Sequence, residues 1–181
     1  MTTWERIEAG SAERRVCLAM NRWGARQALR RFFGVVSRLG DGVLWYALMA
    51  GLAVFGGSHG LFAALHMMLT GLVAAAMYRC LKRWTRRPRP FRAHDGIVAY
   101  IAPLDEFSFP SGHTLHAVSF TLIALAYFPL LAPVLIPFTL MVALSRVVLG
   151  LHYPSDVLAA TLIGCGLATL SLWLAPATGV F

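Results

Sequence analysis

Charged residues are scarce in this chain, and their scarcity limits what kind of protein it can be. Asp, Glu, Lys and Arg make up only 13% of the 181 residues, whereas hydrophobic residues make up 58%. Soluble globular domains carry roughly twice as much charge, about 25%. No charged residue occurs between positions 107 and 145. This composition excludes an ordinary soluble domain and predicts an integral membrane protein.

Cysteine is also rare, and no motif of a nucleic-acid-binding protein is present. The three cysteines, at positions 17, 80 and 165, have no spacing typical of a zinc site or a disulfide framework, so we interpret them as small apolar residues. The formal net charge is +8, but no zinc-finger, basic-zipper or aromatic RNA-binding pattern occurs. A basic chain with apolar spans is expected to face anionic lipid headgroups. The charges near the start of the chain leave no apolar core for a signal peptide.

Uncharged apolar stretches predict an all-α integral membrane protein with five transmembrane helices in one bundle. A span needs about 20 mostly apolar residues. The long stretch 107–145 is divided by Pro129 and Pro133, which favour a hairpin of two helices there. The five predicted spans, within a domain over residues 41–181, are 43–58, 61–78, 112–128, 132–151 and 157–174.

Residues 1–40 form a separate predicted segment with a basic amphipathic pattern. Seven arginines between positions 14 and 38 alternate with large apolar side chains. This pattern is typical of an amphipathic helix that lies among lipid headgroups. The alternative is a sixth span, which would have to bury arginines at about 2.5–3.5 kcal/mol for each central one.

Three separated motifs contain the candidate functional residues. Lys82–Pro90 has the form K-x6-R-P, Pro110–His113 reads P-S-G-H, and Ser145–Asp156 has the form S-R-x5-H-x3-D. The first follows the second span, the second opens the third span, and the last joins the fourth and fifth spans. Alternation of the spans therefore predicts that all three motifs lie on the same membrane face.

The cationic residues of these motifs are candidates for binding phosphate. Lys82 and Arg89 lie in a strongly basic stretch, for which a juxtamembrane cluster binding anionic lipid is the alternative. Phosphoryl transfer depends on positioning and charge stabilisation, and arginine presents a planar fork that matches phosphate oxygens. Arg146 lies inside a span, where a charge costs about 2.5–3.5 kcal/mol and usually marks a functional site.

The second and third motifs each open a helix. Ser111 is a favoured N-cap, and Gly112 lets an anion approach the free backbone N–H groups of the first turn. His113 in that turn could protonate a leaving oxygen. Asp156, near the third position of the last helix, can reach back to His152 and make its other ring nitrogen a better nucleophile. The alternatives are ordinary N-caps beside unrelated histidines.

Together these residues resemble the signature of the type 2 phosphatidic acid phosphatase family, which is related to vanadium haloperoxidases. All signature residues are present, and the likeness extends from about residue 42 to residue 174. It implies a lipid phosphatase that needs no metal or other cofactor. It implies that His152 is a nucleophile that forms a phosphohistidine, with Asp156 as its partner and His113 as the general acid. It also implies the residues that hold the phosphate: Lys82, Arg89, Ser111, Gly112 and Arg146.

Other interpretations of the same region remain open. A metal site would combine His113 and His116 with Asp105 and Glu106, but it would use the histidine of the second motif. The further arginines of the basic stretch are interpreted as a solvated face: Arg83, Arg86, Arg87 and Arg92.

The predicted function is hydrolysis of a phosphomonoester or pyrophosphate on a phospholipid or polyprenyl lipid. One alternative is a phosphotransferase that passes the phosphate to another acceptor. Another is a non-catalytic headgroup-binding protein, which would need the cations but neither His113 nor the pair of His152 and Asp156. The sequence indicates no particular lipid and no oligomeric state.

All 16 Lys and Arg residues fall on the motif side of the five-span topology. The positive-inside rule therefore favours a cytoplasmic active face, in the inner membrane of a bacterium. A periplasmic active face is the alternative and would follow from a sixth span.

Overall fold

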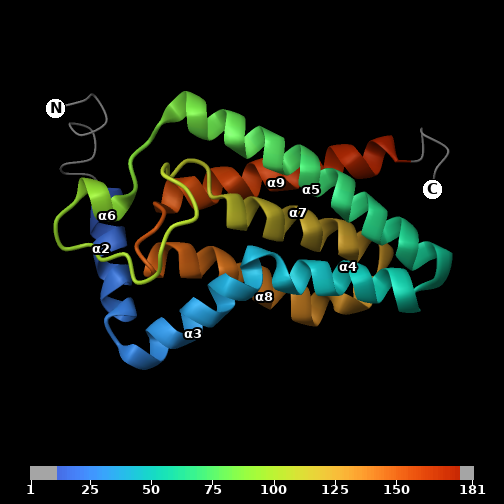
Figure 1. Ribbon diagram of the computed structural model, residues 1–181, viewed down its shortest axis with the longest axis horizontal. Coiled ribbons are helices and arrows are strands. Elements are labelled where there is room, and N and C mark those ends of the chain that lie inside the picture. Colours follow the sequence, from blue (N-terminus) through green and yellow to red (C-terminus); the bar gives the residue numbers. More distant parts are fainter. Residues whose placement is uncertain (1–11, 176–181) are drawn as a thin grey trace.

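Helices and the loops between them build the part of the chain that the structure describes. The computed structural model describes residues 12–175, in which no strand occurs (Figure 1). The elements follow in this order: α2 (Ala12–Gly24), α3 (Gln27–Arg38), a π-helical turn (Leu39–Val43), α4 (Leu44–Phe55), α5 (Gly57–Thr85), α6 (Pro90–Ala93), α7 (Gly112–Tyr127), a 3₁₀ turn (Pro129–Leu131), α8 (Ala132–Val148) and α9 (Pro154–Leu174).

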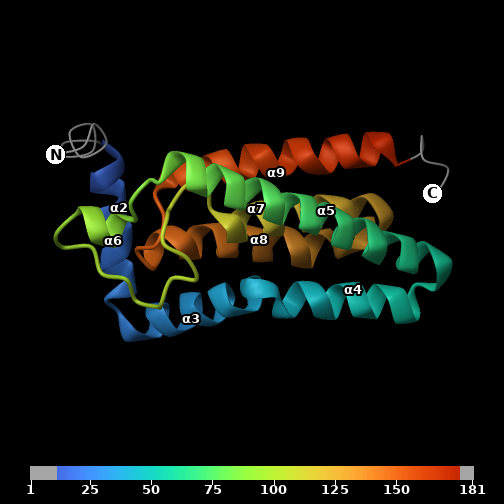
Figure 2. The same cartoon turned by 45° about the horizontal axis from the view of Figure 1, so that its top comes forward.

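The long helices lie side by side along the longest axis of the molecule (Figures 1 and 2). Helix α7 is central and packs against α5, α8 and α9. Figure 2 shows α3 and α4 on one side of the bundle and α9 on the other. Helices α2 and α6 and the loop of residues 94–111 cover one end of the bundle.

Among residues 12–175, four helical segments are long and apolar enough to cross a membrane: Gln27–Phe55, Gly57–Ala93, Pro129–Val148 and Pro154–Leu174. The remaining long helix, α7, has 16 residues and is largely buried between the others. The described part of the chain is therefore all-helical, and the protein is an integral membrane protein, as its composition predicts. Helix α7 corresponds to the third predicted span.

The first long helix begins earlier than the sequence predicts. We expected a span from residue 43, but the helix runs from Gln27 to Phe55 and only bends, in the π-helical turn, at Gly42. The basic segment is thus two helices, and α3 continues directly into α4. Helix α2 has 13 residues, about 20 Å at 1.5 Å per residue. Over the described residues this is shorter than the roughly 30 Å hydrocarbon core of a bilayer.

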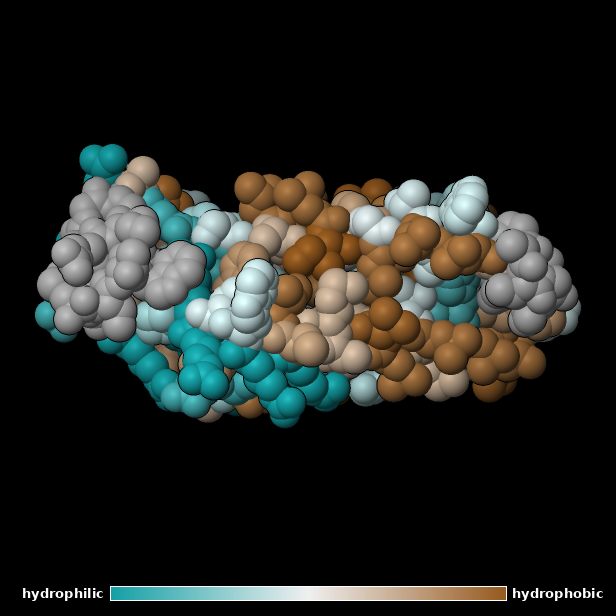
Figure 3. All heavy atoms as spheres, turned by 90° about the horizontal axis from the view of Figure 1, so that it is seen from above, coloured by the Kyte–Doolittle hydropathy of each residue, from teal (hydrophilic) through white to brown (hydrophobic). Residues whose placement is uncertain are grey.

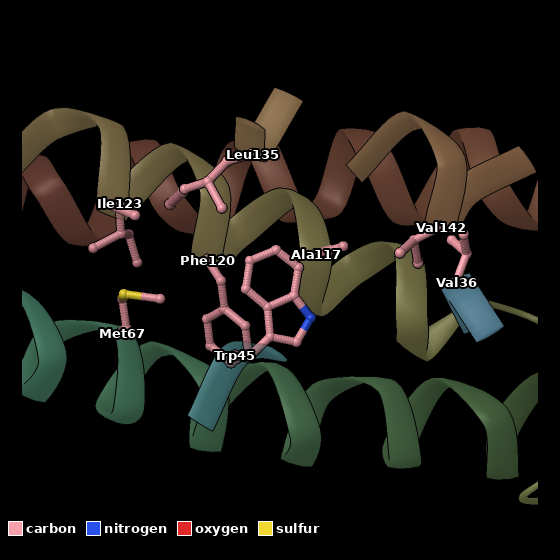
Figure 4. Close-up of a cluster of buried hydrophobic side chains, with 10 residues drawn as sticks. Val36, Trp45, Met67, Ala117, Phe120, Ile123, Leu135 and Val142 are labelled. Atoms are coloured by element: carbon pink, nitrogen blue, oxygen red, sulfur yellow. The ribbon is translucent and has the colours of Figure 1, made fainter. Parts of the chain in front are cut away.

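The main hydrophobic core lies between α4, α5, α7 and α8 (Figure 4). The ring of Trp45 on α4 is buried, 5.5 Å from the ring of Phe120 on α7 and 5.7 Å from that of Phe138 on α8. Met67 and Ile123 pack beside them. Lipid tails are as apolar as these side chains, so close packing must hold the helices together.

A glycine brings α9 close to α7. A Cβ at Gly164 would lie 3.0 Å from the carbonyl oxygen of Leu115 and 3.1 Å from Cβ of Val118. The hydroxyl of Ser119 donates to the carbonyl oxygen of Leu115 at 2.9 Å and to that of Gly164 at 3.3 Å. This contact holds the two helices in register, and the N-terminal ends of both carry motif residues.

Candidate active site

The three motifs come together at the end of the bundle that carries α2 and α6 (Figure 1). Lys82 lies near the end of α5 and Arg146 in the last turn of α8. His113 lies in the first turn of α7, and His152 lies two residues before the start of α9. This arrangement is the one that alternating spans predict.

Lys82 and Arg89 hold a carboxylate between them. Nζ of Lys82 donates to Oδ1 of Asp105 at 2.6 Å and to the carbonyl oxygen of Phe107 at 2.8 Å. Arg89 is only 1% exposed and donates to the same Oδ1 at 2.8 Å and to the carbonyl oxygen of Leu151 at 2.9 Å. Burial raises the pKa of Asp105, but the contacts with Lys82 and Arg89 outweigh it and leave this pKa below its usual value.

Asp105 therefore contacts two cationic side chains and not the histidines of α7. The ring nitrogens of His116 lie 2.9 Å from the carbonyl oxygen of Gly112 and 3.2 Å from that of Gly71. Within residues 12–175, no group of three or more His, Cys, Asp and Glu side chains could hold a metal ion. The alternative metal site that joined Asp105 and Glu106 to His113 and His116 has no support in this geometry.

The first long helix contributes two contacts that the sequence did not reveal. Buried Arg146 donates a hydrogen bond to the hydroxyl of Ser37 in α3. Nε2 of His113 contacts the carboxylate of Asp41 in the π-helical turn. The partners are 109 and 72 residues apart in the chain, so no local spacing links them.

Ser111 caps α7 as predicted, because the N–H of Thr114 points to its hydroxyl at 3.5 Å. The N–H of Ser111 donates to the carbonyl oxygen of Asp156 at 3.3 Å, which ties the beginnings of α7 and α9 together. A Cβ at Gly112 would meet the ring of Tyr78 only at an ordinary contact distance of 3.7 Å. A Cβ would therefore fit at this helix start, and Gly112 itself lines a cavity.

His152 and Asp156 form a buried pair at the start of α9. The N–H of Tyr153 donates to Oδ2 of Asp156 at 2.9 Å, and this oxygen lies 3.5 Å from Nδ1 of His152. The other ring nitrogen, Nε2, lies 3.3 Å from Nη1 of Arg89. Burial and then the positive charges of Arg146 and Arg89 lower the pKa of His152 well below its usual value. The imidazole is therefore neutral near pH 7.

The turn before this pair requires a glycine. Gly150 has a φ of +76°, in the left-handed region that side chains with a Cβ rarely adopt. A Cβ there would also lie 2.4 Å from the carbonyl oxygen of Val98. The backbone at Gly150 thus packs closely against the backbone at Val98, and this contact fixes the direction of the chain just before His152.

A cavity of about 800 Å³ connects these residues. Six of the predicted site residues line it: Lys82, Arg89, Gly112, His113, Arg146 and His152. Ser111 and Asp156, the other two, are fully buried. Asp41 and Asp105 also line the cavity, and its remaining wall comes largely from apolar side chains of α4 and α5.

The interpretation of Arg87 as part of a solvated basic face is wrong. Arg87 is only 7% exposed. Its Nη1 donates to Oδ1 of Asp156 at 2.8 Å and to the hydroxyl of Ser155 at 2.6 Å. Nη2 donates to Oε2 of Glu13 in α2 at 2.8 Å. A run of arginines does not show which of them is turned inward, so the sequence did not single out this one.

Comparison with known proteins identifies similar chains. The family model of the PAP2 superfamily matches residues 59–179. Phosphatidylglycerophosphatase B of Escherichia coli (strain K12) is 39% identical over 74 residues, 38% of this chain and 29% of the relative. A lipid A 1-phosphatase of Rhizobium johnstonii is 30% identical over 110 residues, 59% of this chain and 45% of the relative. The chain thus spans less than half the length of these two relatives.

A solved structure has a similar fold. The crystal structure of Aquifex aeolicus LpxE superposes with a TM-score of 0.79 at 24% identity, covering 92% of this chain and 98% of that one. The family match spans about two thirds of the chain and contains all three motifs. The chain therefore belongs to the PAP2 superfamily, which confirms the resemblance seen in its motifs.

Proposed function

We propose that this protein is a membrane lipid phosphatase that works through a phosphohistidine and without a metal ion. The observation that carries the proposal is the buried pair of His152 and Asp156, with Nε2 of the histidine turned toward Arg89 in the same cavity. Lys82, Arg89 and Arg146 bring three cationic side chains to that cavity. Relatives named as phosphatases of phosphatidylglycerophosphate and of lipid A support the same class of reaction.

In the first step, Nε2 of His152 attacks the phosphorus. The N–P bond forms while the bond from phosphorus to the lipid oxygen breaks, and the electron pair of that bond stays on the leaving oxygen. His113 gives this oxygen a proton. Asp156 stabilises the positive charge that develops on the imidazole. The cations Lys82, Arg89 and Arg146 bind the equatorial oxygens of the phosphoryl group.

In the second step, a water molecule replaces the histidine. Neutral His113 takes a proton from the water as its oxygen attacks phosphorus, and the P–N bond breaks. The electron pair returns to Nε2, which restores neutral His152 and releases inorganic phosphate. The low pKa of His152 makes the imidazole ready to attack again.

The apolar side chains in the wall of the cavity are consistent with a lipid substrate. Tyr46, Met68 and Leu72 line it and are also exposed on the outer faces of α4 and α5. These helices belong to the apolar segments that are suited to contact lipid tails. A phosphorylated lipid would then place its headgroup among the cations and its chains along α4 and α5. A phospholipid or polyprenyl phosphate meets this description.

Purified protein should release inorganic phosphate from pure lipid substrates. We expect activity in a panel of phosphatidate, lysophosphatidate, phosphatidylglycerophosphate and undecaprenyl pyrophosphate. Activity should persist in EDTA, because cationic side chains supply the charge that a metal would otherwise bring. Vanadate should inhibit, since it mimics the pentacoordinate phosphoryl group. Activity lost in EDTA and restored by Mg²⁺ would contradict the mechanism, and phosphate transfer without release would indicate a phosphotransferase.

We further propose that the active end faces the cytoplasm. Hydrophilic residues gather at the end of the molecule that carries α2, whereas apolar residues dominate much of the remaining surface in Figure 3. The turn between α4 and α5 and the turn between α7 and α8, at the other end, contain no basic residue. The positive-inside rule then puts the basic end in the cytoplasm.

Single cysteines at positions 93 and 177, on a background without the three native cysteines, test this orientation. In intact cells an impermeant maleimide should label the cysteine at position 177 and leave the cysteine at position 93 unlabelled until the cells are opened. The reverse pattern would place the active end outside.

A further inference from the structure

We infer that Glu13 and Arg87 are positioning residues that hold Asp156 in place for His152, so that helix α2 is a working part of the active site. This inference rests on the proposed function and concerns residues to which no motif assigns a role. Glu13 lies outside residues 59–179, the segment that the family model matches.

Arg87 provides the counter-charge for a carboxylate that has no access to solvent. Asp156 is 0% exposed, and a buried charge needs an opposite charge and hydrogen bonds to remain ionised. Its Oδ1 accepts from Arg87 at 2.8 Å, and its Oδ2 accepts from the N–H of Tyr153 at 2.9 Å. Both oxygens are thus fixed, and Oδ2 is the one that lies next to the ring of His152.

Glu13 fixes Arg87 and the start of α9 at the same time. Its Oε2 accepts from Nη2 of Arg87 at 2.8 Å, and its Oε1 accepts from the N–H of Ser155 at 2.8 Å. The guanidinium also lies over the ring of Tyr153, 4.0 Å from its centroid. One carboxylate of α2 therefore clamps both the cation that binds Asp156 and the helix turn that contains it.

The result is a row of alternating charges that ends at the reacting ring: Glu13, Arg87, Asp156 and His152. The row passes from α2 through the stretch before α6 to α9. When the imidazole becomes positive during the attack on phosphorus, Asp156 must be ionised and correctly aimed. Arg87 keeps it ionised, and Glu13 keeps Arg87 from turning toward another anion.

The test compares Glu13→Gln, Arg87→Gln and Arg87→Lys in the full-length protein. Rapid-quench measurements separate the rate constant of phosphohistidine formation from the amplitude of the burst, which counts correctly folded sites. We expect Arg87→Gln to lower this rate constant about 10–100-fold and Glu13→Gln about 10-fold, with KM changed little. Arg87→Lys should recover part of the loss, because it retains the charge without the fork. The double variant Glu13→Gln/Arg87→Gln should be little slower than Arg87→Gln alone, because Glu13 acts through Arg87.

Two exposed residues provide matched controls. Arg86→Gln removes a neighbouring arginine, and Asp95→Asn removes a carboxylate from the following loop; both should react at the wild-type rate constant. A lower burst amplitude with an unchanged rate constant in the Glu13 and Arg87 variants would mean that these residues only stabilise the fold, and would overturn the inference. If the wild-type protein itself forms no phosphohistidine, the proposed function fails instead.

Discussion

Replacing His152 with alanine should lower phosphate release by at least about 10⁴-fold, the order of loss seen when an enzyme loses its nucleophile. The reason is that Nε2 of His152 is the atom proposed to form the covalent bond, and it lies 3.3 Å from Nη1 of Arg89 at the cavity wall. The rate of phosphate release should fall, whereas the amount of protein inserted in the membrane should stay the same. Steady-state phosphate release from a lipid substrate measures it.

The control for this experiment is His59→Ala. His59 is exposed and lies at the opposite end of the bundle, within 3.2 Å of the carbonyl oxygen of Tyr127. This variant should keep nearly full activity. Wild-type enzyme quenched during turnover should carry an acid-labile, base-stable phosphate on His152, as a phosphohistidine does. Substantial turnover by the His152→Ala protein would rule out the covalent mechanism.

Arg89→Lys should lower kcat/KM by about 100-fold, although it keeps the positive charge. The guanidinium of Arg89 is almost fully buried and donates in three directions, to the carboxylate and carbonyl of Asp105 and to the carbonyl of Leu151. A lysine ammonium is a single point that cannot span these positions. The binding of vanadate should weaken together with kcat/KM, because both depend on the equatorial oxygens.

Arg92→Lys is the matched control for this prediction. Arg92 lies three positions further along, is half exposed, and pairs with Glu106 at 3.4 Å on the surface. Exposed ion pairs contribute at most about 1 kcal/mol, so this variant should behave like the wild type. An Arg89→Lys protein that binds vanadate as tightly as the wild type would show that the planar fork is not used for phosphate.

The parts of the fold that the sequence could predict depend on local patterns. Uncharged runs located the long helices, and their alternation brought the three motifs to one end. The start of the first long helix was missed because the arginines of α3 resemble a surface helix. The chain instead bends at Gly42 and continues, which places Ser37 and Asp41 beside Arg146 and His113.

The parts of the site that the sequence could not predict depend on contacts between distant segments. Ser111 and Asp156 were found because a helix start imposes a local spacing on its capping residues. The hydrogen bond from Arg87 to Glu13 joins residues 74 positions apart, and that from Lys82 to Asp105 joins residues 23 positions apart. Buried cations usually have anionic partners, but composition alone does not show which ones.

The carboxylate of Asp105, between Lys82 and Arg89, affects how tightly a phosphate can bind to these two cations. Lys82 and Arg89 share Oδ1 of Asp105, whose side chain is 38% exposed on a loop. On the proposed function, a lipid phosphate that binds to Lys82 and Arg89 must replace the carboxylate of Asp105. Binding is then an exchange of one anion for another. Its affinity is then a difference between two ionic contacts, and the same carboxylate competes with the inorganic phosphate that must leave. An enzyme that turns over repeatedly benefits from holding its product no more tightly than this exchange allows.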